Sequence, residues 1–166
     1  MPDSSSVDLL LLRHGIAERR VNGLDHPDRA LTHRGRLRTR AVVRQLRLLG
    51  VEADRLISSP YRRARETAEE AVQAGLAPSL QMADALAPGG DPWRILRGLK
   101  GRCLLVGHEP DLGDFASALI GARPGGVRLR KAGFCHLRWC ADLEDPHGMA
   151  DLQALLRPRL LFPRSV

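Results

Sequence analysis

The chain has 166 residues, 43% hydrophobic and 27% charged, and its 26 Lys and Arg against 19 Asp and Glu give a net charge of +7. A chain of this size is expected to form one globular domain, residues 1–166, which buries roughly 70% of the surface that the unfolded chain exposes. This composition excludes a disordered chain. The longest apolar run, 9–12, is far shorter than the roughly 20 residues of a membrane-spanning helix.

The first residues and the cysteines predict the compartment. Residues 1–6 have neither the basic start nor the long apolar stretch of a secretory signal. Cys103, Cys135 and Cys140 cannot all pair with one another and lack C-x-x-C spacing, which favours reduced, buried thiols over a structural zinc site. We therefore expect a cytoplasmic protein with no membrane contact and no metal.

The basic excess consists almost entirely of arginine, because Lys100 and Lys131 are the only lysines among the 26 basic residues. A guanidinium group can hold a phosphate through two parallel hydrogen bonds. A positive surface attracts nucleic acid, anionic membranes or phosphorylated molecules, and charge alone does not choose among them. A biased base composition of the genome would produce the same excess.

The first half of the chain alternates apolar runs with helical patterns. Residues 7–12 predict a buried strand, and apolar residues recur at helical spacing from about 32 to 50. A second strand is expected at 54–58, followed by a helix that begins with Ser59 as its cap and Pro60 at its first position. The arginines of the first helix are expected to form a solvated face: Arg34, Arg36, Arg38, Arg40, Arg44 and Arg47.

The second half continues the alternation. A third strand is expected at 79–82, a short helix from Asp91-Pro92 to about Leu99, a buried strand at 103–106 and a helix closed by Gly121. The remaining expected elements are strands at 127–129 and 134–140 and a terminal helix at 151–156. This order predicts an α/β fold: a three-layer α/β/α sandwich whose central sheet is mostly parallel, with an antiparallel edge strand.

Three short motifs follow three predicted strands. They are Leu-Arg13-His14-Gly, Ser59-Pro-x-x-Arg63-Ala-x-x-Thr, and Val-Gly-His108-Glu-Pro. Because binding crevices of such sheets lie beyond the carboxyl ends of the strands, these residues are expected to meet there. A single tripeptide is a weak signal, whereas three motifs in the same structural context are specific.

Together with the segments 29–35 and 86–91, these motifs resemble the histidine phosphatase superfamily, and more closely its short SixA-type phosphohistidine phosphatases. The resemblance implies a phosphoglycerate mutase-like fold, with His14 as nucleophile and Arg13, Arg63 and His108 as the phosphate pocket. A neutral imidazole can form a phosphohistidine intermediate without metal or cofactor, while cationic donors neutralise the phosphoryl oxygens.

Further residues of the site follow from the same resemblance. Arg29 is expected to contribute a fourth donor to the substrate. Ser59 either adds its hydroxyl or helix-start amides, or is a plain N-cap. Glu109, beside the pocket histidine, either contacts substrate or only shapes the start of the following helix.

The general acid is less well defined. SixA-type proteins often carry a glutamate where this chain has Ala85, and the candidates nearby are Asp84 and Asp91. Asp91 has a competing role as a helix cap. A missing acid is tolerable for a phosphoramidate such as phosphohistidine, whose leaving nitrogen can be protonated without a dedicated carboxylate.

The expected partner is therefore a phosphorylated protein or a small phosphorylated substrate. The resemblance implies a metal-independent phosphatase that removes phosphate from phosphohistidine in a protein. The alternatives to this function are a small-molecule phosphomonoesterase, a phosphoglycerate mutase-like enzyme, and a non-catalytic, basic nucleic-acid-binding domain. Six aromatic residues are few for a stacking platform and no nucleic-acid motif is present, so no nucleic-acid partner is expected.

Overall fold

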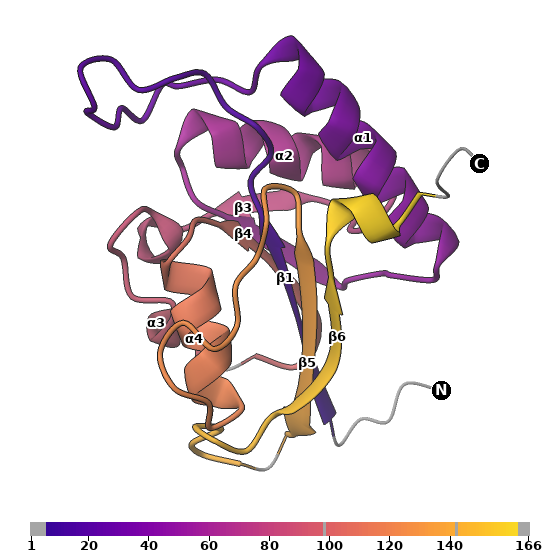
Figure 1. The fold of residues 1–166 in the computed structure, drawn as a ribbon. Coiled ribbons are helices and arrows are strands. Elements are labelled where there is room, and N and C mark those ends of the chain that lie inside the picture. The colour runs from indigo at the N-terminus through magenta and orange to yellow at the C-terminus, as the bar shows by residue number, and fades with distance from the viewer. Residues whose placement is uncertain (1–5, 98, 142, 163–166) are drawn as a thin grey trace.

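The computed structural model describes residues 6–97, 99–141 and 143–162. A six-stranded sheet runs through the molecule, with helices on both of its faces (Figure 1). The elements are β1 (Ser6–Arg13), α1 (His33–Leu48), β2 (Arg55–Ser58), α2 (Arg62–Gln73), β3 (Leu80–Met82), η1 (Asp84–Leu86), α3 (Trp93–Leu96), β4 (Gly101–Gly107), α4 (Asp111–Leu119), β5 (Phe134–Cys140), β6 (Asp151–Leu156) and η2 (Pro158–Leu160).

The sheet has the order β3-β2-β4-β1-β5-β6. The first four of these strands pair in parallel, while β5 pairs antiparallel with both β1 and β6. The mostly parallel sheet predicted from the sequence is confirmed. The antiparallel strand lies one place inside the edge, and β6 forms the edge itself.

Alternating side chains of β1 build two separate cores. Leu9 and Leu11 face α4 in one hydrophobic cluster, while Leu10 and Leu12 face α1 and α2 in the other. All four leucines are at most 4% exposed, as expected for a central strand covered on both faces. The result is the expected three-layer sandwich, in which α3 and α4 cover one face and α1 and α2 the other (Figure 1).

Two arginines of α1 form ion pairs with α2, whereas the sequence placed them on a solvated face. Arg36 forms an ion pair with Glu66 and Arg40 with Glu70, at 3.1 and 2.9 Å, and both glutamates are buried on α2. The hydrogen bonds from Arg40 are the main reason why the pKa of Glu70 lies below its ordinary value, against the opposing effect of burial. These arginines hold the two helices together.

The C-terminal region corrects two predictions. Residues 151–156 form β6 rather than a helix, and 127–129 form an irregular segment rather than a strand. A six-residue helix is marginal by itself, whereas β5 offers a row of unpaired backbone groups, and Phe134 pairs there with Leu156. Backbone pairing therefore outweighs the helical preference of these residues.

Two helix boundaries also differ from the prediction. Helix α2 begins at Arg62, with Tyr61 at its N-cap, rather than at Ser59-Pro60. Helix α3 ends at Leu96, before the predicted Leu99. Within the described residues, no helix has the length and apolar character needed to cross a membrane.

The three cysteines are unpaired thiols. Cys103 and Cys135 are buried, and burial raises their pKa values to about 11 and about 12. Cys140 is exposed at the end of β5, so the prediction of three buried thiols is wrong for this residue.

Candidate active site

The two motif histidines meet at the carboxyl ends of β1 and β4. Arg13 pairs with Gly107 in the parallel register, and the next residues along each strand are His14 and His108. The His14 backbone N–H donates to the Gly107 carbonyl at 3.0 Å. The two imidazole rings lie 5.1 Å apart between centroids, so the sheet register itself brings the histidines together.

His14 is buried and its geometry selects one tautomer. Its Nδ1 lies 2.7 Å from the Gly15 carbonyl oxygen, which can only accept, so Nδ1 carries the proton and Nε2 keeps a lone pair. Burial lowers the pKa of His14 to about 2, against the effect of the Gly15 carbonyl, and the charges of His108, Arg63 and Arg13 lower it further. The ring is therefore neutral over the physiological pH range.

The glycine after His14 is required by close packing. A Cβ at Gly15 would collide with the Thr39 hydroxyl of α1. The Gly15 N–H donates to Thr67 Oγ1 at 3.0 Å, and Thr67 in turn donates to the Arg63 carbonyl at 2.7 Å. Thr67 thus connects the motif after β1 to the motif on α2, one helical turn beyond Arg63.

A buried arginine, Arg63, and a half-buried one, Arg13, flank the histidines. Arg63 is 2% exposed and donates from Nη1 to the His26 carbonyl at 3.3 Å, with its guanidinium over the Tyr61 ring at 5.0 Å. Arg13 donates to the Leu129 carbonyl at 3.0 Å. The Nε atoms of both arginines are buried and have no hydrogen-bond partner within the described chain. Buried, unpartnered donors carry a desolvation cost that an anionic ligand would relieve.

His108 and Ser59 form a second pair. His108 Nε2 lies 2.7 Å from Ser59 Oγ, while its Nδ1 is buried without a partner among the described residues. Burial lowers the pKa of His108 to about 3. Ser59 Oγ also accepts from the Tyr61 N–H at 3.2 Å. Ser59 therefore contacts the pocket histidine and is not the N-cap of α2.

Asp25 connects two cations of the site, Arg63 and Arg29, and no sequence motif had predicted it as a site residue. Its carboxylate accepts from Arg63 Nη2 at 2.8 Å and from Arg29 Nε at 2.8 Å. Burial raises the pKa of Asp25, but the hydrogen bonds and charges of Arg29 and Arg63 outweigh burial and hold the pKa below its ordinary value. Arg29 also donates to the Glu18 carbonyl at 2.6 Å.

The two histidines, Arg13, Arg63, Asp25 and Arg29 line a cavity of about 470 Å³, which we call the catalytic cavity; Ser59 is not among its lining residues. Lys131 also lines it and was not singled out from the sequence. Burial lowers the pKa of Lys131, and Arg13, Arg29, Arg63 and Arg20 lower it further. The lining residues are Arg13, His14, Ala17, Glu18, Arg19, Arg20, Asp25, Arg29, Arg63, Pro88, His108, Glu109 and Lys131.

Glu109 lines the catalytic cavity, but backbone groups hold its carboxylate. Its Oε1 accepts from the Leu129 N–H at 3.3 Å. Burial raises the pKa of Glu109, and it outweighs the opposing effects of that hydrogen bond and of Arg13. The side chain thus fixes the 127–129 segment, whose Leu129 carbonyl holds Arg13.

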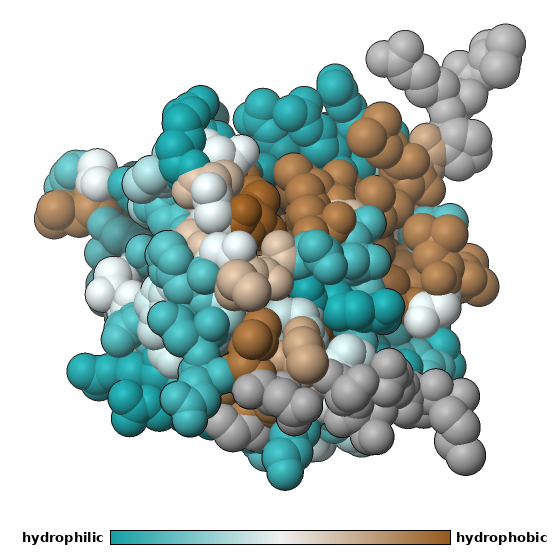
Figure 2. Space-filling model, turned by 90° about the horizontal axis from the view of Figure 1, so that it is seen from below, coloured by the Kyte–Doolittle hydropathy of each residue, from teal (hydrophilic) through white to brown (hydrophobic). Residues whose placement is uncertain are grey.

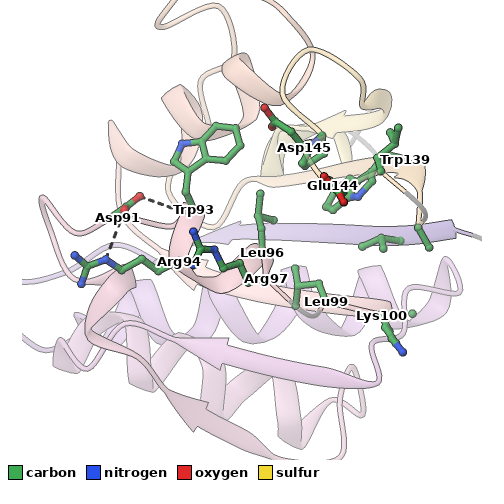
Figure 3. A pocket seen from close by; sticks show the side chains of 15 residues that line it. Asp91, Trp93, Arg94, Leu96, Arg97, Leu99, Lys100, Trp139, Glu144 and Asp145 are labelled. Atoms are coloured by element: carbon green, nitrogen blue, oxygen red, sulfur yellow. Dashed lines mark hydrogen bonds and ion pairs between the residues drawn. The ribbon is translucent and has the colours of Figure 1, made fainter.

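Neither candidate acid from the 84–91 segment lines the catalytic cavity. Asp84 is exposed at the start of η1. Asp91 accepts from the Trp93 N–H at 3.1 Å and pairs with Arg94 at 3.6 Å (Figure 3). It borders a separate cavity of about 1130 Å³, the distal cavity, together with Val7 and Gly101 at the amino ends of β1 and β4.

The distal cavity lies at the opposite end of the sheet from the two histidines. Seen from below, where the parallel strands begin, the molecule shows a band of hydrophobic residues among hydrophilic ones (Figure 2).

Within the ranges that the structure describes, no group of three or more His, Cys, Asp or Glu side chains is arranged to hold a metal ion.

Comparison with known proteins identifies the family. Residues 9–87 match the family model of the histidine phosphatase superfamily, branch 1. An uncharacterised protein of Picosynechococcus sp. (strain ATCC 27264 / PCC 7002 / PR-6) is 36% identical over 165 residues, covering 95% of this chain and 100% of that protein. The chain belongs to the histidine phosphatase superfamily, and phosphatase chemistry is the activity that this membership supports.

Solved structures agree with the fold. The protein histidine phosphatase SixA in complex with tungstate matches with a TM-score of 0.76 and 23% identity, over 93% of this chain and 99% of that chain. A phosphoserine phosphatase mutant of Entamoeba histolytica, in complex with phosphoserine, matches with a TM-score of 0.68 and 16% identity, over 94% and 100% of the two chains. The fold is thus that of SixA and is shared with phosphatases of small molecules.

Proposed function

We propose that the protein is a metal-independent phosphohistidine phosphatase, with His14 as its nucleophile. The observation that carries this proposal is the neutral, buried ring of His14, whose Nε2 keeps its lone pair. Arg13, Arg63 and His108 lie beside it. Each of these three side chains has a buried nitrogen without a hydrogen-bond partner among the described residues. A phosphoryl group placed among them would meet a nucleophile and cationic donors at once.

The reaction then takes two displacements. The Nε2 lone pair of His14 attacks phosphorus while the bond from phosphorus to the leaving group breaks, and the leaving atom takes up a proton. Water then attacks the phosphorus of phospho-His14, which releases inorganic phosphate and a proton and restores the neutral ring. Arg13 and Arg63 neutralise the charge on the three equatorial oxygens during both steps.

Ser59 has a positioning role in this proposal. Since Ser59 Oγ accepts from the Tyr61 N–H, its hydroxyl proton is available for His108 Nε2. His108 would then carry its own proton on Nδ1, the atom without a partner, and could donate it to a phosphoryl oxygen. Arg29 helps to position Arg63, because both arginines donate hydrogen bonds to the carboxylate of Asp25.

The acidic groups of the catalytic cavity favour phosphohistidine as substrate. The three carboxylates that line it are Glu18, Asp25 and Glu109. Glu18 is exposed, Asp25 is held ionised by two arginines, and Glu109 is held by backbone N–H groups, while Asp84 and Asp91 do not line the cavity. A cavity with few free acids suits a phosphoramidate, whose leaving nitrogen is basic enough to be protonated without strong acid catalysis.

The test is hydrolysis of a phosphohistidine peptide and of p-nitrophenyl phosphate by the purified protein, with EDTA present. His14→Ala should lower kcat/KM by about 10⁴-fold or more, whereas the control His33→Ala, an exposed change on α1, should keep full activity. Retained activity in His14→Ala would exclude the proposed nucleophile. A preference for small alkyl monoesters would favour the phosphomonoesterase alternative, and interconversion of phosphoglycerates the mutase alternative.

A further inference from the structure

A third, smaller cavity is lined almost entirely by cations. It has a volume of about 380 Å³, and we call it the basic cavity. One cation comes from α1, two from the loop before β5, and two from the residues around η2. The lining residues are Ile16, Arg38, Arg130, Lys131, Arg157, Pro158 and Arg159, with no carboxylate among them.

Among the residues that the structure describes, no carboxylate lies within ion-pair distance of any of the five cations of the basic cavity. Neighbouring arginines on the same helix behave differently, because Arg36 and Arg40 are paired with Glu66 and Glu70. A local set of unpaired like charges destabilises the folded state unless an anion binds there.

The basic cavity adjoins the catalytic cavity. Lys131 lines both, and Ile16 of the basic cavity precedes Ala17 of the catalytic cavity in the chain. The turn that carries Arg130 and Lys131 is bonded directly to the nucleophile motif: the Ala132 N–H lies 3.1 Å from the Arg13 carbonyl and 3.2 Å from that of His14. An anion in the basic cavity would therefore lie beside a phosphoryl group on His14.

The core fixes the positions of both basic segments. Ala132 and Leu161, which follow Lys131 and η2, are buried in the same hydrophobic cluster as Leu12. Pro158 is buried as well. The backbone of the basic cavity is thus anchored, while the five cationic side chains themselves are exposed.

This exposure distinguishes the ligand of the basic cavity from that of the catalytic cavity. A single phosphoryl group is held tightly by buried, converging donors such as Arg63. Exposed cations at the rim contribute long-range attraction and fit several anionic groups spread over a surface. The geometry therefore suits side-chain carboxylates of a protein more closely than a second phosphate of a small molecule.

From these observations we infer that the basic cavity is a docking site for an acidic segment of the phosphorylated protein substrate, next to its phosphohistidine. The inference rests on the proposed function and adds a determinant of substrate choice outside the catalytic cavity. It also assigns a role to Arg38, which the sequence pattern placed on a solvated helix face.

The test compares two phosphohistidine peptides that differ only in their flanks, Asp and Glu in one and Asn and Gln in the other. The double variant Arg157→Gln/Arg159→Gln removes two cations that lie outside the catalytic cavity. The matched control, Arg34→Gln/Arg44→Gln, removes the same charge from exposed positions of α1 that line neither cavity. The third substrate is p-nitrophenyl phosphate, which has no flank to bind.

We expect the wild-type protein and the control to prefer the acidic peptide by about fivefold to tenfold in kcat/KM, mainly through KM. The Arg157→Gln/Arg159→Gln variant should lose this preference and keep wild-type kinetics with p-nitrophenyl phosphate. Equal use of both peptides by the wild type would overturn the inference, and so would a preference that persists in the double variant.

Binding of the unphosphorylated acidic peptide separates this inference from the proposed function. If the wild type binds that peptide and the double variant does not, the docking site stands even if phosphohistidine is not hydrolysed. If a single-stranded oligonucleotide of equal charge binds at the same residues more tightly than the peptide, the basic cavity serves nucleic acid and the inference is wrong.

Discussion

The catalytic cavity and the distal cavity lie at opposite ends of the same central strands, and the distal cavity is the larger, at about 1130 Å³ against about 470 Å³. Their charges differ in kind. The distal cavity is lined by three cations and three carboxylates: Arg94, Arg97, Lys100, Asp91, Glu144 and Asp145. The catalytic cavity is lined by six cations against three carboxylates, and Arg63 among these cations is almost completely buried.

The proposed active site is thus the smaller of these two cavities, and charge and burial distinguish it, not volume. Side chains at the carboxyl ends of β1 and β4 converge because the strands are parallel and in register, so histidines from distant parts of the chain face one another. In the distal cavity, Asp91 and Arg94 are exposed and paired with each other. Catalysis is expected where donors are buried and lack partners among the described residues, as Arg13 and Arg63 do at the carboxyl ends of the strands.

After His14→Ala, the largest effect on activity is expected for Arg63→Lys in the catalytic cavity. A lysine keeps the charge but cannot donate through two parallel N–H groups, so kcat/KM should fall by about 100- to 1000-fold. The matched change Arg94→Lys in the distal cavity should leave kcat/KM unaltered. Steady-state kinetics with p-nitrophenyl phosphate measure both. A similar loss in the two variants would remove the distinction between the cavities.

The buried His14 ring makes the stability of the fold depend on pH. His14 titrates near 6.5 in the unfolded chain but at about 2 in the folded protein, so its contribution to stability is complete above pH 6.5 and is lost as pH falls toward 2. At pH 5 the loss for this one ring is about 2 kcal/mol. Urea unfolding at neutral pH and at pH 5 should show that loss, and His14→Gln should reduce it. An unchanged loss in His14→Gln would contradict a neutral, buried ring.

Asp25 accepts from Arg63 Nη2 and lines the same cavity as the proposed nucleophile. Its negative charge opposes an oxyanion bound there and offsets part of the charge of Arg63. Asp25→Asn removes the competing charge and should tighten inhibition by vanadate or phosphate by about fivefold, since the pair is partly exposed and screened. Inhibition constants measure the change. Weaker inhibition would mean that Asp25 is needed to orient Arg63 for the ligand.

The smallest effect on activity is expected for Asp91→Ala, beside the distal cavity. Asp91 accepts from the Trp93 N–H at the start of α3, so its loss should lower the free energy of unfolding by about 1 kcal/mol. Thermal unfolding measures this loss, and kcat/KM should stay at the wild-type value. A fall in kcat/KM larger than threefold at full folding would give the aspartate a part in catalysis after all.

The motif residues could be placed from the sequence because each directly follows, or lies a few residues after, an apolar run that can only be a central strand. Once 7–12 and 103–106 are read as parallel strands, His14 and His108 must lie at the same edge of the sheet. Two hydrogen bonds depend on side-chain directions that no residue pattern specifies: the one from Arg13 to the Leu129 carbonyl and the one between Ser59 and His108.

The parts that the sequence did not reveal depend on tertiary contacts. Asp25 lies in a long loop without periodicity, and its role exists only because Arg29 and Arg63 converge on it. Lys131 reaches the catalytic cavity because the turn after it bonds to the Arg13 and His14 carbonyls. Residues 151–156 become a strand because β5 has an unpaired edge.

The central claim, that His14 is the nucleophile, is tested most directly by trapping its intermediate. The protein is mixed with a phosphohistidine peptide and quenched in alkali, in which phosphohistidine is stable, and the phosphorylated residue is located by mass spectrometry. We predict a phosphoryl group on His14 Nε2, the ring nitrogen that does not contact the Gly15 carbonyl, and no phosphorylated residue in the His14→Ala variant. Turnover without a phosphorylated protein, or a phosphoryl group on His108, would contradict it.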